Sequence, residues 1–542
     1  MKWSLNMPSR TLPSMWTDTC SCRRSCPENC RSYRASLPRR RTDNMKTEEL
    51  WKQYEEQRFK ISAYHLVLGT TFYDSDTIAP EKGRQYRNER MAYLEGEVFD
   101  METDPKFIEL RETLYNREDL PEQKKQILKW ELKDLESFRY IPKDLYVEYN
   151  ELTMNSNVAW KKAKNANDYK MFEPYLLKII DLSKKMLQYR KGDLQGYDVY
   201  LSDYEPGMTV EKYDRFFDLI REKLVPLIKK ISAAPQIDTS FTNRFYPADQ
   251  QRKMMKKIMD YMQFDWEAGV LGETEHPFTS SLSKYDDRVT THYYENNLLS
   301  SIFSVIHETG HATYNYQVAD ELAETYVFDN MSSGMHESQS RLMENYLGRN
   351  SAFWDNLYPE MVKLFPQQLS DISQQQFVDA ANASVCSLIR TEADELTYPL
   401  HILIRYEIEK GIFDGSIDVN DLENIWNDKY EEYLGIRPTC ASEGILQDVH
   451  WSGGSFGYFP TYALGSGYAA QFIHAMRKDL DIEACLSNNE FGKIKEWLKE
   501  HIHKYGGYYL PQQQIKIATG EEFDPQYYID YLTEKYSALY KL

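Results

Sequence analysis

The sequence predicts a mainly α-helical protein with a small β-sheet near its middle. Apolar residues recur at helical spacing over most of the chain, as at Leu128, Leu132 and Leu135. Segments that look like strands are few, and no internal repeat or low-complexity linker follows residue 44. No apolar run approaches the roughly 20 residues that a membrane helix needs. Together these observations favour a soluble helical protein.

The expected elements follow from local patterns along the chain. Each apolar stripe forms one helix face, with polar residues on the opposite face. We expect Pro226 to end or kink the helix in which it lies, because proline lacks a backbone N–H. The clearest strand is Arg288–Tyr293, which is rich in β-branched and aromatic residues. The segments expected to be helical are 128–138, 176–187, 216–224, 254–262, 298–306, 400–409 and 527–539.

Charge limits the possible partners. The 542 residues contain 65 Lys+Arg and 84 Asp+Glu, which gives a formal net charge of −19. This acidity argues against nucleic acids and anionic membranes as partners, because both attract basic surfaces. Only three cysteines follow residue 44, namely Cys386, Cys440 and Cys485. Such sparse cysteines form no disulfide framework and predict a reducing, cytoplasmic location.

The first 44 residues differ from the rest of the chain. They carry a formal charge of +6, whereas the remainder carries −25, and they include Cys20, Cys22, Cys26 and Cys30. The cysteines could form a small metal knuckle, but their spacing lacks the paired C-x2-C arrangement of common zinc modules. The polar, arginine-rich composition favours a disordered or non-native extension instead. Residues 45–542 are then expected to form the folded protein, as a single domain.

The motif that carries chemistry is His307-Glu308-Thr309-Gly310-His311, which matches His-Glu-x-x-His. Positions i and i+4 lie on one face of a helix, so both imidazoles can bind one Zn²⁺. Glu308 would project toward the open coordination position and act there as a general base. Two unrelated surface histidines are the alternative, but the pattern needs three specific residues at once.

A catalytic zinc site needs a third protein ligand. Tyr314 and Gln317 stand where a metzincin has glycine and histidine, so that class is excluded. A carboxylate is expected instead, and Glu337 is preferred because it begins a helical segment that can pack back against the first helix. His336 is assigned to the surroundings of the metal or to the substrate cleft. The downstream carboxylates weighed as ligands were Asp320, Glu321, Glu324, Glu337 and Glu344.

Five further motifs occur in a fixed order around this one. They are His276-Pro277-Phe278, Asp286–Thr290 (Asp-x-Arg-x-Thr), His336–Gln339, Ile389–Asp394 (Ile-Arg-x-x-Ala-Asp) and Gly444–Trp451 (Gly-x-x-Gln-Asp-x-His-Trp). With the zinc motif they resemble the thermostable carboxypeptidase Taq family of zinc metallocarboxypeptidases. The resemblance extends from about Met45 to Leu542 and leaves out the first 44 residues.

The resemblance implies a helical zincin with a deep active-site cleft and a small sheet beside the zinc helix, commonly a homodimer. It implies release of single residues from the C-termini of peptides, with broad side-chain preference. The family's zinc ligands correspond to His307, His311 and Glu337, and its general base to Glu308. Zn²⁺ is the expected metal, one per chain, and Co²⁺ is an alternative because first-row metals overlap in such sites.

The residues that bind substrate are less determined. A free C-terminal carboxylate suits a bidentate arginine, for which Arg288, Arg390 and Arg437 are candidates. Arg390 is preferred because its motif resembles one associated with that role, although a structural ion pair with Asp394 or Glu392 remains open. Arg288 lies on the expected strand, whose edge could bind the substrate backbone. The candidates for oxyanion donors are His450, Tyr458 and Tyr462, which are expected to lie in a glycine-rich, flexible-looking loop.

Two rival functions remain at the sequence level. A helical oligoendopeptidase would use the same zinc chemistry without a carboxylate clamp. A catalytically silent scaffold or peptide-binding protein would keep a structural metal but lack the general base, and the intact Glu308 counts against it. The preferred hypothesis is a metallocarboxypeptidase acting on peptides with a free C-terminus.

Overall fold

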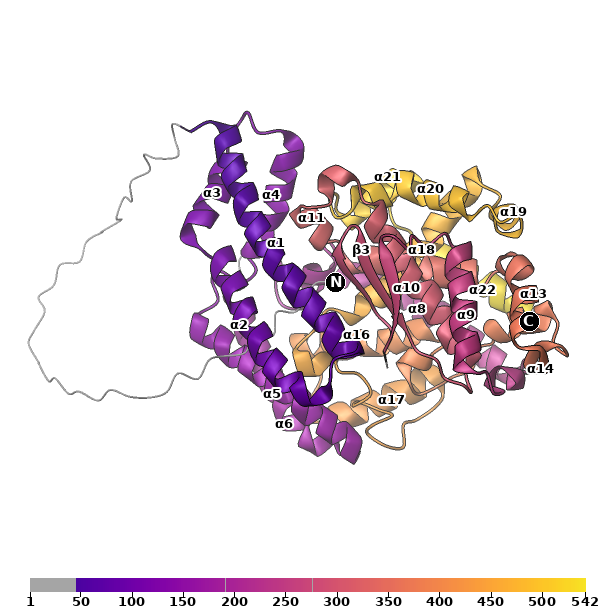
Figure 1. Cartoon of the computed structure of the whole chain (residues 1–542). Coiled ribbons are helices and arrows are strands. Elements are labelled where there is room, and N and C mark those ends of the chain that lie inside the picture. The colour runs from indigo at the N-terminus through magenta and orange to yellow at the C-terminus, as the bar shows by residue number, and fades with distance from the viewer. Residues whose placement is uncertain (1–44, 191, 275) are drawn as a thin grey trace, which may run out of the picture.

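The computed structural model describes residues 45–190, 192–274 and 276–542 (Figure 1). The prediction for residues 1–44 therefore lies outside the described residues. The first helices are α1 (Thr47–Thr77), α2 (Arg84–Glu102), α3 (Pro105–Tyr115), α4 (Glu122–Leu135), α5 (Lys143–Ala166), α6 (Glu173–Leu187), α7 (Tyr197–Tyr204), α8 (Val210–Ala233) and α9 (Ala248–Tyr261).

A short sheet and a long helix follow at the centre of the chain. The strands are β1 (Gly269–Glu273), β2 (Thr279–Ser283) and β3 (Asp286–Thr291). The helices after them are α10 (Leu298–Gln317), α11 (Tyr326–Asp329), α12 (Ser333–Arg341), α13 (Trp354–Leu364), α14 (Pro366–Leu369), α15 (Gln374–Ala381), α16 (Tyr398–Asp414), α17 (Leu422–Leu434), α18 (Phe459–Asp479), α19 (Ile482–Ser487), α20 (Phe491–His501), α21 (Pro511–Thr519) and α22 (Gln526–Tyr540). The expectation of a mainly α fold with a small central sheet is confirmed.

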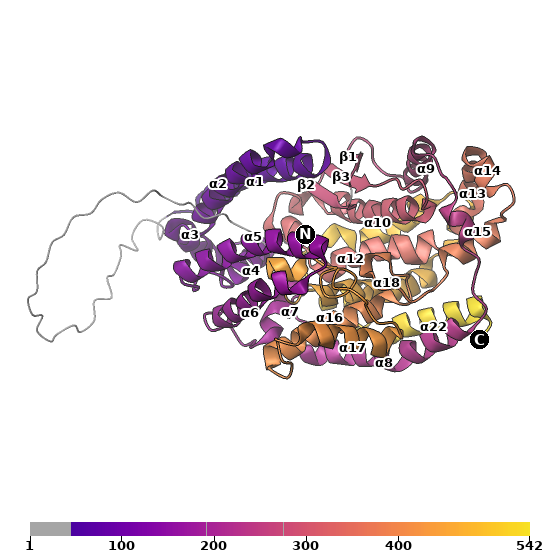
Figure 2. The same cartoon turned by 90° about the horizontal axis from the view of Figure 1, so that it is seen from below.

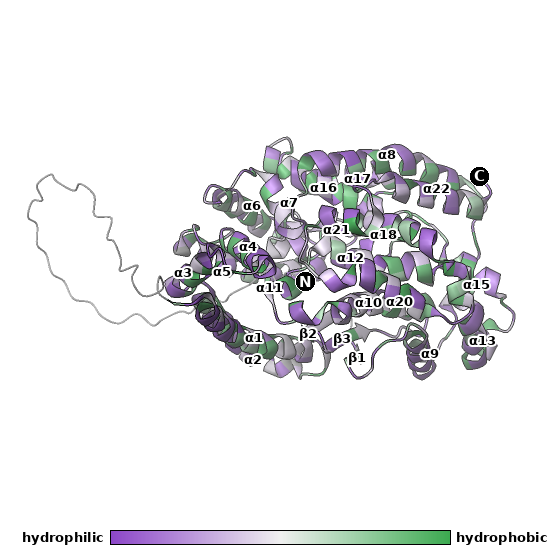
Figure 3. Ribbon diagram, turned by 90° about the horizontal axis from the view of Figure 1, so that it is seen from above, coloured by the Kyte–Doolittle hydropathy of each residue, from purple (hydrophilic) through white to green (hydrophobic). Residues whose placement is uncertain are grey.

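The body of the molecule is layered (Figure 2). Helices α10, α12 and α18 lie in the middle, and α12 contacts both α10 and α18. The sheet and α9 cover one side, and α8, α16, α17 and α22 cover the other. Hydrophilic and hydrophobic colours alternate along most helices in Figure 3, as expected for helices with one buried face. The middle layer is thus shielded on both sides.

Helices α1 to α4 have a small core of their own, to one side of the body (Figure 1). Leu50 and Trp51 of α1, Val98 of α2, Leu114 of α3 and Leu128 of α4 are among its buried residues. A buried ion network lies beside this core. Its arginines are Arg58 and Arg111, and its carboxylates are Glu102, Glu131 and Asp329. Because Asp329 belongs to α11, the network joins the four helices to the body.

The three strands pair in the order β1-β3-β2. Strand β3 is central, running parallel to β1 and antiparallel to β2. Its inward face is buried, with Val289 and Thr291 fully covered. Strands β2 and β3 pack on α10, so the sheet supports the helix that carries the His-Glu-x-x-His motif.

Some element ends differ from the sequence-based expectation. The strand begins at Asp286 rather than Arg288 and ends at Thr291. Helix α4 ends at Leu135, so Phe138 lies in the turns before Pro142. Helix α8 does not end at Pro226 but continues to Ala233. Burial of the apolar residues that follow the proline offsets a helix defect of about 3 kcal/mol.

The described part of the chain contains no helix long and apolar enough to cross a membrane. Cys386, Cys440 and Cys485 carry free thiols, and Cys485 is buried. The expectation that these three cysteines form no disulfide with one another is confirmed.

Candidate metal centre

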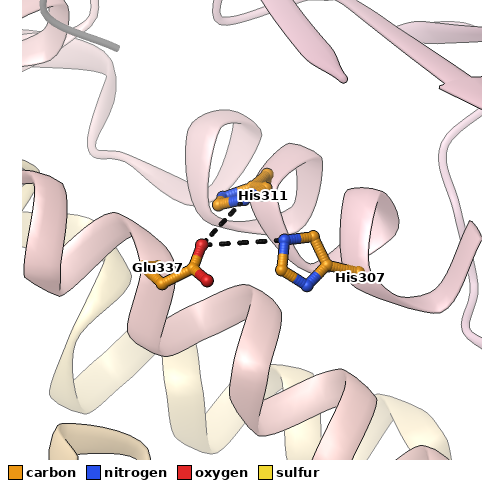
Figure 4. Close-up of side chains that lie close together, drawn as sticks. All are labelled: His307, His311 and Glu337. Carbon is orange, nitrogen blue, oxygen red and sulfur yellow. Dashed lines mark ion pairs between the residues drawn. The ribbon is translucent and has the colours of Figure 1, made fainter. Parts of the chain in front are cut away.

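His307, Glu308 and His311 lie on α10, and Glu337 lies on α12. The Nε2 atoms of His307 and His311 are each 3.6 Å from Oε2 of Glu337 (Figure 4). All three candidate ligand atoms lie within 4.8 Å of one another. Four ligands placed tetrahedrally about 2.1 Å from one ion stand about 3.4 Å apart. This donor set therefore fits a small divalent metal.

Helix α18 sets the position of Glu337 from behind. Gly465 of α18 approaches so closely that a Cβ atom there would lie 2.7 Å from Cγ of Glu337. On its other side, Nε of Arg341 donates to Oε1 of Glu337 at 2.7 Å. The carboxylate is thus oriented with Oε2 directed at the two histidines.

The tautomer of His307 is determined by Glu344. Nδ1 of His307 lies 2.9 Å from Oε2 of Glu344, which also accepts a hydrogen bond from Arg341 at 3.1 Å. Because a carboxylate accepts, Nδ1 carries the proton and Nε2 keeps its lone pair for a metal. Glu344 lies in a π-helical turn, Leu342–Gly348, that continues α12. Such turns often occur at functional sites.

The other downstream carboxylates do not approach this centre. Asp320, Glu321 and Glu324 are exposed, and Asp320 pairs with Lys284. Of the candidate carboxylates, Glu337 faces both His307 and His311. Glu344 contacts His307 but not His311.

Glu308 is buried and contacts strand β2. Thr279 donates to Oε2 of Glu308 at 2.6 Å and to its backbone carbonyl at 3.1 Å. Burial raises the pKa of the Glu308 carboxyl, and His307 and the Thr279 hydrogen bond oppose this rise. A carboxylate of raised pKa is suited to accept a proton near neutral pH.

Arg390 is buried in the short helical turn Arg390–Glu392. Its Nε and Nη2 donate to Oδ1 of Asp448 at 3.0 and 2.8 Å, and Nη1 donates to Tyr398 at 3.1 Å. The partner is thus Asp448, not the Asp394 or Glu392 considered from the sequence. Arg405 contacts the other oxygen of Asp448. Together the two arginines hold the pKa of the Asp448 carboxyl far below its usual range despite its burial.

The other two arginines have different surroundings. Arg288 lies on β3, donates to both oxygens of Asp286 and stacks over the ring of Tyr73. Arg437 is exposed and pairs with Asp428 and Glu431.

His450, Tyr458 and Tyr462 lie together next to Arg390. The ring of His450 stacks against Tyr458, and its Nε2 is 3.3 Å from the hydroxyl of Tyr462. Burial lowers the pKa of His450 to about 3 and raises the pKa of Tyr458 to about 12. Glu337 also raises the pKa of both tyrosines, so the group lies within electrostatic reach of the candidate metal centre.

The glycine-rich segment before Tyr458 is held at several points. Buried Glu409 of α16 accepts from Nε1 of Trp451 and from the backbone N–H of Gly457, both at 2.7 Å. One turn before Glu409 on α16, Arg405 donates to the side chain of Gln447 at 2.9 Å. The composition predicted a flexible loop here, but His450 lies in a short helical turn (His450–Gly453) and Tyr462 lies on α18. Helix α16 also holds the segment through Glu409 and Arg405.

A cavity of about 590 Å³ lies away from these residues, between α4, α7 and the start of α21. Its lining includes Trp130, Arg190, Tyr326 and Leu510, and none of the three candidate metal ligands. Arg190 is already paired with Asp203. This cavity therefore does not contain the candidate metal centre on α10 and α12.

The profile of the Carboxypeptidase Taq (M32) metallopeptidase family matches residues 53–536. The chain belongs to this family. It is accordingly a metallocarboxypeptidase, a hydrolase that acts on peptides. The resemblance that the sequence motifs indicated is confirmed.

Curated and solved relatives of this metallocarboxypeptidase cover nearly its whole folded length. Carboxypeptidase 1 of Bacillus subtilis is 43% identical over 90% of this chain and 99% of its own. Thermostable carboxypeptidase 1 of Thermus thermophilus is 36% identical over 88% of this chain and 97% of its own. The solved M32 carboxypeptidase of Deinococcus radiodurans has a TM-score of 0.88 at 32% identity, covering 91% of this chain and 100% of that one.

Several contacts of this M32 carboxypeptidase were missed in the sequence. Arg341 follows Glu337 by four residues and Asn315 follows His311 by four, so helical spacing could have indicated both. No local signal pointed to Thr279 or Glu409, and the motif that contains Asp448 did not indicate its partner, because each of the three reaches its partner from a distant segment.

Proposed function

We propose that the chain holds one Zn²⁺ between His307, His311 and Glu337 and removes single residues from the C-termini of peptides. The observation that carries this proposal is the approach of both histidine Nε2 atoms to Oε2 of Glu337 at 3.6 Å. Co²⁺ would fit the same donors. Broad side-chain preference, a cytoplasmic location and a homodimer with one metal per chain are part of the proposal. The proposal also includes a deep cleft over the metal and a single catalytic domain formed by residues 45–542. It includes no nucleic-acid or membrane partner.

A bound metal would polarise the scissile carbonyl and lower the pKa of water. Glu308 takes the proton of the attacking water and passes it to the leaving amine. Thr279 orients this carboxylate through its hydrogen bond at 2.6 Å, so the base is positioned before substrate binds. The burial of Glu308 limits competing water around it.

Arg390 is the proposed receptor for the terminal carboxylate. Its hydrogen bonds to Asp448 and Tyr398 engage one N–H on each of its three nitrogens. An arginine has five N–H donors, so one donor on each terminal nitrogen is left for a bidentate partner. Asp448 would hold the guanidinium in place while it binds substrate. Arg288, on the central strand of the sheet, is proposed to contact the substrate farther from the terminus.

His450, Tyr458 and Tyr462 are the proposed donors to the oxyanion of the tetrahedral intermediate. Burial raises the pKa of both tyrosines, so each keeps its proton and can donate at neutral pH. The lowered pKa of His450 makes its ring a neutral donor.

Peptide digestion followed by mass spectrometry tests this function. A ladder that shortens one residue at a time from the C-terminus is expected, and both a chelator and Glu308→Gln should abolish it. Internal fragments, or undiminished cleavage of a C-terminally amidated peptide, would support the endopeptidase instead. Unchanged turnover by Glu308→Gln would contradict the assignment of the general base.

A further inference from the structure

The second ring nitrogen of His311 contacts another histidine. Nδ1 of His311 lies 2.6 Å from Nδ1 of His336, and the two rings stack. At this distance one nitrogen must donate and the other accept. For His311 to bind a metal through Nε2, its single proton must be on Nδ1. His336 must therefore accept through Nδ1 and carry its own proton on Nε2.

Asn315 and Asp287 continue this chain of hydrogen bonds. Nε2 of His336 lies 2.9 Å from Oδ1 of Asn315, and Nδ2 of Asn315 donates to Oδ1 of Asp287 at 2.8 Å. Oδ1 of Asp287 accepts from the Asn315 amide, and this bond lowers the pKa of the Asp287 carboxyl against the rise that its burial causes. Asp287 therefore orients the amide of Asn315 with its oxygen toward His336. Every bond then runs in the direction that leaves Nε2 of His311 unprotonated.

The opposite direction would prevent metal binding. If the Asn315 amide were reversed, its NH₂ group would donate to Nε2 of His336, whose proton would move to Nδ1. His311 would then accept at Nδ1 and carry its proton on Nε2, the atom that faces Glu337. The two directions use the same atoms, so the group at the end of the chain determines which one forms.

Burial makes this end group decisive. Asp287 is fully buried on β3, and Asn315 is 2% exposed on α10, so bulk water does not replace either partner. The hydrogen bond between them joins the sheet to the last turn of the zinc-motif helix. Glu344 performs the corresponding role for His307 with a direct carboxylate contact.

We propose that Asn315 and Asp287 are positioning residues that select the metal-binding tautomer of His311 through His336. This inference rests on the proposed metal site of His307, His311 and Glu337. Outer partners of metal-bound histidines commonly contribute 10–100-fold to metal affinity. The inference extends such a contribution to a carboxylate three hydrogen bonds away from the ligand.

Metal affinity of purified variants tests the proposal. Zn²⁺ dissociation constants would be measured by competition with a chromophoric chelator, beside the melting temperature of each metal-free protein. Asn315→Ala should bind Zn²⁺ about 10–100-fold more weakly than the wild type. The double variant Asp287→Asn/Asn315→Asp moves the carboxylate one position along, keeps an acceptor for His336 and should bind within about threefold of wild type.

Asn382→Ala is the matched control, since Asn382 is a buried asparagine whose amide bonds only backbone carbonyls. It should leave Zn²⁺ affinity unchanged even if it lowers the melting temperature. Equal affinity of Asn315→Ala and wild type would overturn the proposal, and so would a double variant as weak as Asn315→Ala. If His307→Ala leaves the wild-type affinity intact, the metal site itself is wrong and the proposed function fails with it.

Discussion

Gly310 of α10 lies directly against the backbone of Ser340 in α12. A Cβ atom at Gly310 would be 2.7 Å from Cα of Ser340 and 2.8 Å from the carbonyl oxygen of Gln339. The two helices cross here, between the histidines of the motif and Glu337. Their close approach is what brings the ligand atoms from two helices to one point.

We expect Gly310→Ala to separate these helices. Backbone atoms cannot rotate away as a flexible side chain can, so overpacking should cost about 1–3 kcal/mol of stability. Zn²⁺ affinity should fall at least about tenfold, because the ligand spacing widens. Chelator competition and thermal unfolding measure the two effects.

Gly96→Ala is the matched control on α2, where a Cβ atom would meet nothing within 4 Å. It should stabilise the protein by about 0.4–1 kcal/mol, since alanine favours helix. A Gly310→Ala protein with wild-type metal affinity would show that the helix crossing does not set the ligand geometry.

Glu131 should stabilise the four N-terminal helices. Its carboxylate is 2% exposed, accepts from Tyr54 at 2.9 Å and lies 3.5 Å from both Arg58 and Arg111. Removing one partner from a buried ion network costs about 3–5 kcal/mol. Glu131→Ala should therefore raise hydrogen exchange throughout α1–α3.

The comparison is Glu112→Ala, which removes a half-exposed carboxylate paired with Arg139. Its effect should stay below about 1 kcal/mol. If exchange in α1–α3 is the same in both variants, the ion network does not hold these helices.

Arg390→Lys should weaken recognition of the substrate terminus. A lysine cannot replace a bidentate guanidinium, so kcat/KM for a peptide with a free C-terminus should fall about 100-fold. Cleavage of the amidated peptide should change little. The ratio of the two rates is the readout, because it does not depend on how much of the variant is folded.

Arg288→Lys distinguishes the two arginines. The ratio of its cleavage rates on the free and the amidated peptide should stay near the wild-type value, since Arg288 is paired with Asp286 on the sheet. If Arg288→Lys lost the preference for the free over the amidated C-terminus and Arg390→Lys kept it, Arg288 on strand β3 would be the residue that binds the terminal carboxylate of the substrate.

Glu409 should make stability depend on pH. Burial raises the pKa of Glu409 to about 7, above the usual value of about 4.5. The folded protein thus holds this proton more tightly than the unfolded chain, so its contribution to stability is complete below about pH 4.5 and is lost as pH rises through 7. Relative to Glu409→Gln, the wild type should lose up to about 3 kcal/mol between pH 4.5 and 8.

Tyr197→Phe provides a second measurement of this effect. The Tyr197 hydroxyl donates to Oε2 of Glu409 at 2.6 Å and lowers the pKa of this carboxyl. Without it, the loss of stability should extend to higher pH. Thermal unfolding across the pH range measures both effects. If the stabilities of the wild type and Glu409→Gln change in parallel with pH, Glu409 is not the group that makes stability depend on pH.

Much of the fold and the centre of the site could be predicted from local sequence. Helical spacing identified segments of α4, α6, α8, α9, α10, α16 and α22, because a buried face repeats every three to four residues, but it singled out no segment of the long helices α1 and α5. The same spacing placed His307 and His311 on one face and identified Arg288–Thr291 as part of the central strand. The ends of elements were less predictable, as at Pro226, where burial of neighbouring side chains outweighs the local cost of proline.

By itself the sequence determined the family, the predominance of helix and the donors that can hold a metal, since each depends on residue type and local spacing. Only the tertiary structure decided how those donors are oriented. Glu344 selects the tautomer of His307, Thr279 orients Glu308, and Asp448 holds Arg390. These partners come from other turns, strands or loops, and packing of distant segments brings them within hydrogen-bond distance. No periodicity in a single sequence records such a contact.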